Sequence, residues 1–124
     1  MKVDVSLGEL VDKVTILAIK LEKVKDAAKR ENIKKEHDIL YAAMRSVDIS
    51  EDSDGYRRLM VINRKLWDIE DHIRAKEAAK QFDAAFVELA RSVYFTNDER
   101  AAVKRDINIR YGSELMEEKE YADY

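Results

Sequence analysis

The sequence contains no cysteine and no proline, and it has only three glycines, at positions 8, 55 and 112. Without cysteine the chain can form neither disulfides nor thiolate metal sites, and it has no thiol nucleophile. Few residues are present that end helices or make tight turns. This composition favours helices over strands and predicts an all-α protein.

Long apolar runs are also missing. No run approaches the ~20 residues that a membrane-spanning helix requires. The first fourteen residues carry Asp4, Glu9 and Asp12 among their apolar side chains, unlike a secretory signal or transit peptide. We therefore expect a cytoplasmic protein without a membrane partner. Its 124 residues are enough for one helical domain, spanning residues 1–124, with a core of its own.

Charge is abundant but balanced. The chain has 23 basic and 26 acidic residues and a net charge of −3. The interleaved signs are typical of solvated helix faces rather than of a nucleic-acid-binding surface. The lysine-rich stretch 20–35 is interrupted by Glu22, Asp26 and Glu31 and has no aromatic residue for base stacking. The sequence does not favour nucleic acid as a partner.

The first predicted helix begins at a capping box, in which Ser6 is followed three residues later by Glu9. Apolar residues then recur at alternating spacings of three and four, the pattern of a helix packed along another. They are Leu7, Leu10, Val14, Leu17, Leu21, Val24 and Ala28. Ile16 and Ile19 fall toward the opposite side. This helix is expected to contact two neighbours, and in so small a protein one of them can be another subunit.

A second apolar pattern starts out of register with the first, at Ile33, and continues to Val47. Either one long helix rotates its buried face, or the helix breaks near residues 29–33 with Asn32 as a cap. Continuity is favoured because no glycine or proline stops the helix there. The acidic segment 48–55 then predicts a solvated loop.

The remaining sequence predicts three further helices. One covers residues 56–80, and a compact one follows Asp83, a residue type that caps helix N-termini. A second capping box, Thr96 followed by Glu99, starts the last main helix, which ends near Gly112. Residues 113–124 form an acidic C-terminal extension. The expected fold is a bundle of four main helices, of which the first is long.

Polar residues at helical spacing form two groups. The first is a stripe on one flank of the helix over residues 56–80, composed of Asn63, Trp67, Glu70 and Arg74. The second, on the last helix, is composed of Asn97, Asp98, Arg100, Lys104, Arg105 and Asn108. Asp68 and His72 are also four residues apart, but they face away from the stripe, and two exposed groups are too few ligands for a metal. No metal and no cofactor is predicted.

Glu9 and Asp12 have the ExxD spacing found in small all-α nucleoside-triphosphate pyrophosphohydrolases. Those enzymes hold Mg²⁺ between an ExxD stretch and an EExxE stretch on a neighbouring helix. The present sequence contains no EExxE, so the carboxylate cage would be incomplete.

Two interpretations of the polar groups are open. If the helices pack antiparallel, Glu70 is expected to meet Arg100 or Arg105. The favoured interpretation is a structural ion-pair network in a non-enzymatic helical interaction or accessory module. Such a module would bind a protein partner or self-associate, as a homodimer through the first helix. The alternative is an Arg/Glu pocket that binds or acts on an anionic small molecule, a nucleotide or sugar nucleotide.

Three strings carry a resemblance: SLGELVDKVTIL from Ser6, LWDIEDHIR from Leu66 and LARSVYFTNDERAAVKRDIN from Leu89. They resemble a family of small all-helical proteins of unknown function from bacteria and cyanobacterial viruses. The resemblance implies a cytoplasmic helical protein and brings no known activity. The candidate residues within these strings are Trp67, Glu70, Arg74, Arg91, Asn97, Asp98, Arg100, Lys104 and Arg105.

Overall fold

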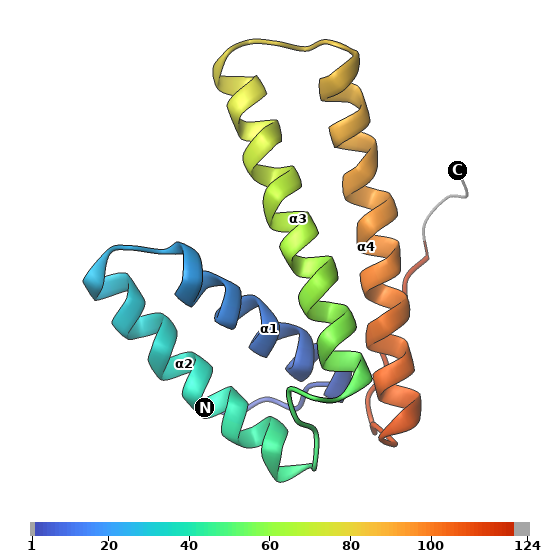
Figure 1. Cartoon of the computed structure of the whole chain (residues 1–124). Coiled ribbons are helices and arrows are strands. Elements are labelled where there is room, and N and C mark those ends of the chain that lie inside the picture. Colours follow the sequence, from blue (N-terminus) through green and yellow to red (C-terminus); the bar gives the residue numbers. More distant parts are fainter. Residues whose placement is uncertain (1, 121–124) are drawn as a thin grey trace.

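The computed structural model describes residues 2–120, which form four α-helices. They are α1 (Leu7–Lys23), α2 (Ala27–Ser46), α3 (Asp54–Ala78) and α4 (Ala84–Arg110). No strand occurs in this part of the chain, so the all-α prediction is confirmed. Figure 1 shows two helical hairpins, α1–α2 and α3–α4, of which the second extends well beyond the first. None of the helices within residues 2–120 is long and apolar enough to cross a membrane.

The long first helix that the sequence favoured is interrupted at residues 24–26, so that prediction is wrong. The break also precedes the alternative site, at 29–33. Val24 has an extended backbone, with ψ of 130°, and Asp26 caps α2 by accepting a backbone N–H of its first turn. Arg30 donates to two carbonyl groups at the end of α1. These contacts satisfy backbone groups that a helix end leaves open, and they need neither glycine nor proline.

Other helix ends lie where capping residues predict them. Ser6 Oγ accepts a hydrogen bond from the N–H of Glu9 at 3.1 Å, and Asp83 Oδ1 accepts one from the N–H of Phe86 at 2.9 Å. Gly112 follows α4 with a φ of +67°, a conformation that glycine adopts without strain after a helix end.

The second predicted capping box does not begin a helix. α4 continues through Thr96 and Glu99, and Thr96 is buried within it. A Thr-x-x-Glu spacing is compatible with a helix interior, and packing against α3 stabilises the continuous helix. The two helices predicted after Asp83 are therefore one.

The hydrophobic core lies where the two hairpins meet, and it leaves the far half of the α3–α4 hairpin outside it. Its buried members are Leu10, Val11, Val14, Met44, Ile49, Tyr56, Leu59, Ile62, Val103 and Ile107. Ile49 belongs to the segment 48–55, so the predicted solvated loop is in fact anchored in the core by one side chain.

α1 packs against all three other helices. Ile19, which the sequence assigned to a second neighbour, is buried within the chain itself, and Ile16 is half-buried. Both side chains border a groove beside α3. The second apolar side of α1 is thus covered by the protein's own α3.

Candidate functional site

Asp12 is a buried carboxylate on α1, and its side chain is only 1% exposed. Arg100 reaches it from α4 with two N–H groups, Nε to Oδ1 at 2.8 Å and Nη2 to Oδ2 at 2.5 Å. The hydrogen bond with Asp12 raises the pKa of Arg100 above its usual value, although burial opposes this shift. Two-point pairing of this kind fixes both distance and orientation, so it sets the register of α1 against α4.

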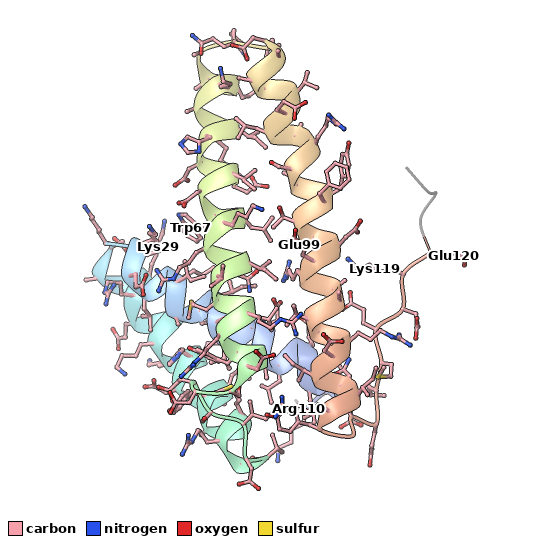
Figure 2. The ribbon with its side chains drawn as sticks, turned by 45° about the vertical axis from the view of Figure 1, so that its right-hand side comes forward. Lys29, Trp67, Glu99, Arg110, Lys119 and Glu120 are labelled. Atoms are coloured by element: carbon pink, nitrogen blue, oxygen red, sulfur yellow. The ribbon has the colours of Figure 1, made fainter. Side chains whose placement is uncertain are left out.

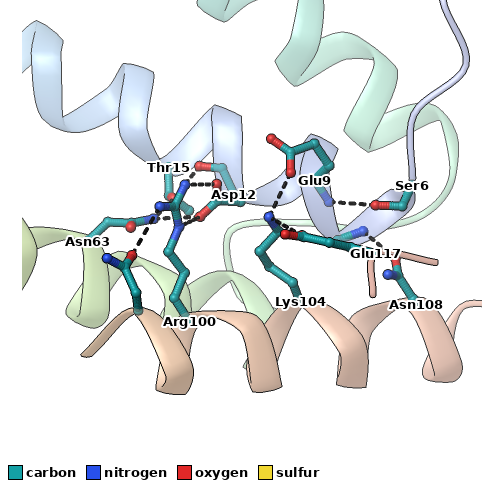
Figure 3. A network of polar contacts seen from close by, with 11 residues as sticks. Ser6, Glu9, Asp12, Thr15, Asn63, Arg100, Lys104, Asn108 and Glu117 are labelled. Atoms are coloured by element: carbon teal, nitrogen blue, oxygen red, sulfur yellow. Dashed lines mark hydrogen bonds and ion pairs between the residues drawn. The ribbon is translucent and has the colours of Figure 1, made fainter. Parts of the chain in front are cut away.

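Asn63 brings α3 into the same network. Its Nδ2 donates to Asp12 Oδ1 at 3.0 Å and to Thr15 Oγ1 at 2.9 Å, and Thr15 Oγ1 donates to the backbone carbonyl of Asp12 at 2.7 Å. Figure 3 shows these groups converging between the three helices. Within residues 2–120 no buried side-chain nitrogen or oxygen lacks a hydrogen-bond partner. The network is closed rather than poised to accept a ligand.

Lys104 lies one turn along α4 from Arg100, and its side chain is 8% exposed. Its Nζ lies 2.6 Å from a carboxylate oxygen of Glu9 on α1 and 2.6 Å from one of Glu117 in the C-terminal segment. Burial alone would lower the pKa of Lys104, but hydrogen bonds with Glu117 and Glu9 raise it above its usual value. The ammonium group therefore stays charged and joins three segments (Figure 3).

α1 approaches α4 closely at Gly8. The N–H of Gly8 donates to Asn108 Oδ1 at 2.6 Å. A Cβ atom at position 8 would lie 2.4 Å from the backbone oxygen of Lys104, so only glycine fits without moving a helix. This approach brings Asp12 within reach of Arg100, one turn further along.

The expected contact of Glu70 with Arg100 or Arg105 is absent. Glu70 instead pairs with Arg74 on its own helix, with Nε and Oε2 3.6 Å apart, and both side chains are exposed. The carboxylate that meets Arg100 comes from Asp12 of α1, which packs against both α3 and α4. Arg105 pairs with Glu118 at 2.9 Å on the surface.

Half of the predicted site residues nevertheless border one open groove between α1 and α3, with a volume of about 490 Å³. Its lining residues are Ile16, Ile19, Asn63, Leu66, Trp67, Glu70, Asp71, Arg74 and Arg100. Figure 2 shows Trp67 on α3 at about the same height as Lys29, which lies in the first turn of α2. The groove is mainly apolar on its α1 side and charged on its α3 side. Both of its arginines are paired with carboxylates.

The other predicted residues separate into two sets. Asn97 and Lys104 border a smaller polar hollow of about 230 Å³ beside the C-terminal segment. Arg91, Asp98 and Arg105 are exposed on α4 and border neither cavity, and Arg91 pairs with Glu88 at 2.9 Å. The ten candidate residues therefore do not form a single site.

The sequence interpretation missed Asp12 and Thr15 as the centre of the network. Both lie on the same side of α1 as Ile16 and Ile19, at spacings of three, four and seven residues. Polar residues on the same side of a helix as large apolar residues indicate a buried polar pair, and this pattern is present in the sequence. No comparable signal marks Glu117, which lies among other glutamates in the C-terminal extension.

The ExxD pair does not resemble a cation cage. Asp12 binds Arg100 and Glu9 binds Lys104, so each carboxylate group is already paired with a positive side chain. Among the residues that the structure describes, no three His, Cys, Asp or Glu side chains are grouped to hold a metal ion.

Comparison with models of protein families gives a match over residues 1–124. The matching family is DUF6165, described as a family of unknown function. Comparisons with curated proteins and with solved structures give no match. The match supports the resemblance inferred from the three strings insofar as the family is one of unknown function. The chain belongs to the DUF6165 family of unknown function.

Proposed function

We propose that the protein is a non-enzymatic helical interaction module that self-associates as a homodimer. The observation that carries this proposal is the exposed apolar surface on the far half of the α3–α4 hairpin. Within residues 2–120, this part of the fold has two helices and no third element to cover them (Figure 1). Isolated two-helix layers do not bury the apolar side chains that they present.

The exposed surface is defined by four side chains, here called the distal patch. They are Phe82, Val87, Tyr94 and Phe95, which are 58%, 50%, 42% and 43% exposed. Val87 and Tyr94 are seven residues apart on α4 and so share one side of the helix. The rings of Tyr94 and Phe95 are 4.9 Å apart between centroids. Clustered exposed aromatic residues are typical of protein interaction sites.

A second copy of the chain is the partner that fits this surface. Two distal halves related by a two-fold axis would supply four helices, each covering the open side of the other hairpin. Residues 84–98 of α4 extend about 22 Å at the helical rise of 1.5 Å per residue. That length provides about four turns of helix contact. Arg91, paired with Glu88, lies on the same side of α4 between Val87 and Tyr94, so each copy would bring apolar side chains and one charge pair to the contact.

The closed charge network supports a structural rather than a reacting role. Arg74, Arg91, Arg100 and Arg105 are each paired with a carboxylate. Only the pair of Arg100 with Asp12 is buried, and buried pairs specify packing more often than they catalyse reactions. Of the polar residues that the sequence singled out, Arg91 lies at this surface, with its guanidinium carbon 5.8 Å from the centre of the Phe95 ring.

Size-exclusion chromatography with light scattering tests the proposal through substitutions in the patch. The wild-type chain is expected to elute with the mass of two chains. Val87→Glu and Tyr94→Glu are each expected to elute with the mass of one, because a dimer would bury an unpaired carboxylate. Circular dichroism checks that both variants keep their helices.

Ile39→Glu is the matched control, since Ile39 is 70% exposed on α2, outside the patch. This variant should remain a dimer. Loss of the dimer in the control as well, or its persistence in both patch variants, would contradict the assignment of the surface.

The groove beside α1 supports a second candidate function, the binding of an anionic small molecule. Its volume of about 490 Å³ lies in the range of ligand pockets, and Trp67 offers a flat ring for a base. A thermal-shift screen with nucleotides and sugar nucleotides at millimolar concentration tests it. A ligand at about 100 times its Kd would stabilise the fold by about 2.7 kcal/mol. No shift with any of these compounds would exclude this candidate at that affinity.

The setting that we propose is the cytoplasm of a bacterium or of a cell infected by a cyanobacterial virus. The resemblance carried by the three strings supports it. Fractionation of cells that express the tagged chain tests the location, and recovery with the membrane fraction would contradict it.

A further inference from the structure

Residues 113–120, here called the C-terminal strap, turn back at the end of α4 and run beside it. Figure 2 shows this course, with Lys119 and Glu120 alongside the helix that ends at Arg110. The strap has almost no regular structure. Its aliphatic residues, Leu115 and Met116, are 44% and 38% exposed, so they are only partly covered and neither belongs to the buried core.

Two adjacent glutamates of the strap contact two adjacent cations of α4. Glu117 lies 2.6 Å from the ammonium group of Lys104, and Glu118 lies 2.9 Å from the guanidinium group of Arg105. Ser113 adds a polar contact by accepting a hydrogen bond from the N–H of Leu7 at 3.1 Å. The strap is therefore held mainly as an acidic peptide on a basic surface.

The surface beneath Glu117 is a formed site. Lys104 is almost fully buried, yet its ammonium group faces the polar hollow of about 230 Å³ that Glu117 enters. Asn97 and Arg100 border the same hollow. The hydrogen bond with Lys104 holds the pKa of Glu117 below its usual value, so this carboxylate is charged at neutral pH.

Removing the strap would leave the surface with an excess of positive charge. Asp12 would still neutralise Arg100, and Glu9 would still neutralise Lys104. The charge of Arg105 would lose its carboxylate, and Lys104 would lose one of its two. An incoming segment with two adjacent carboxylates would restore both contacts.

We propose that Lys104 and Arg105 form a docking site for an acidic peptide segment of a protein partner, which the C-terminal strap occupies in the isolated chain. The strap is a displaceable occupant. Glu118 and Arg105 are both exposed, and exposed pairs contribute little stability. The strap competes mainly through its high effective concentration, which is in the millimolar range for short tethers. The site is separate from the distal patch, so neither proposal depends on the other.

A binding experiment in trans tests the site with the full chain. The probe is a fluorescein-labelled peptide of residues 112–120, GSELMEEKE, followed by fluorescence anisotropy. The double variant E117Q/E118Q removes the charges of the tethered strap without touching the core. The peptide should bind this variant about tenfold more tightly than wild type, because the competing strap is weakened. A peptide with both glutamates changed to glutamine should not bind.

Two further substitutions in the E117Q/E118Q background locate the contact. Arg105→Glu should weaken peptide binding at least fivefold, whereas Arg110→Glu, an equal charge change on the same helix, should not. Equal affinity for wild type and E117Q/E118Q, or equal effects of the two arginine variants, would overturn the proposal.

A second measurement uses the wild-type chain, so it does not depend on any variant. Excess unlabelled peptide should shift the backbone amide NMR resonances of residues 113–120 as the strap is displaced. Unchanged resonances at saturating peptide would also overturn the proposal.

Discussion

Asp12 and Arg100 are 88 residues apart in the chain and form a two-point ion pair between α1 and α4. The carboxylate is almost completely inaccessible to water, and Asn63 of α3 donates to the same oxygen as the arginine. Three helices thus meet at one carboxylate. Charged groups in such a position specify a single packing arrangement, since any shift of one helix would leave a buried charge uncompensated.

Arg100→Ala should destabilise the fold by about 3–5 kcal/mol, because it leaves the buried carboxylate of Asp12 without its cation. Urea unfolding followed by circular dichroism measures the change. Arg74→Ala is the control, since this exposed pair with Glu70 should contribute less than about 0.5 kcal/mol. Similar losses for the two variants would mean that the buried pair has no special role.

Gly8→Ala should destabilise the fold by about 1–3 kcal/mol, a typical cost of overpacking. The added Cβ would meet the backbone oxygen of Lys104 at 2.4 Å, and backbone cannot rotate out of the way. Thermal unfolding measures the effect. At Gly112 nothing lies within 4 Å of such a Cβ, so Gly112→Ala should cost only the strain of its positive φ, about 1 kcal/mol. An unchanged melting temperature for Gly8→Ala would show that α1 and α4 are not held this closely.

Asp26→Ala should destabilise the fold by about 1 kcal/mol, because it removes the side chain that caps α2. Asn32→Ala, inside α2, should have little effect. Chemical denaturation of both variants distinguishes the observed break from the one predicted near residues 29–33. A larger effect at Asn32 would favour the latter.

Acidification should release the C-terminal strap. The pKa of Glu117 is lowered in the folded protein from its usual 4.5 by the hydrogen bond with Lys104. A carboxyl group with a depressed pKa in the folded state stabilises the fold fully above 4.5, and this contribution disappears as the pH falls through the folded value. The difference in unfolding free energy between wild type and Glu117→Gln should therefore shrink below pH 4.5. A difference that is independent of pH between 7 and 3 would contradict the assignment.

The fold was largely predictable because helix periodicity and capping are local properties. Ser6 and Asp83 cap helices as their sequence positions indicate. The errors came from features with ambiguous local signals. In the sequence, Asp26 is one of several charged residues in a lysine-rich stretch. Its role at the helix break depends on Arg30, which donates to the carbonyl groups of Leu21 and Val24. The sequence around Thr96 has the pattern of a helix N-cap. In the structure α4 continues through this residue and packs against α3.

The polar network was less predictable because it joins residues of three helices, α1, α3 and α4. The pattern along one helix does not show how it is placed against the others. The sequence identified Asn63, Arg100 and Lys104 as candidates, and all three belong to the network. Their partners, Asp12 and Glu9, come from α1, whose orientation no local pattern reveals. Helical spacing and antiparallel packing predict Glu70 as the partner, but neither determines which side chains of two helices come within contact distance.

Sedimentation equilibrium of the wild-type chain tests self-association most directly. Measured from about 1 μM to several hundred micromolar, the average mass should rise from 14.4 kDa toward twice that value as the distal patches pair. Val87→Glu, measured in parallel, should stay at the mass of one chain. A wild-type mass that remains at 14.4 kDa at the highest concentration would contradict the account of a self-associating module.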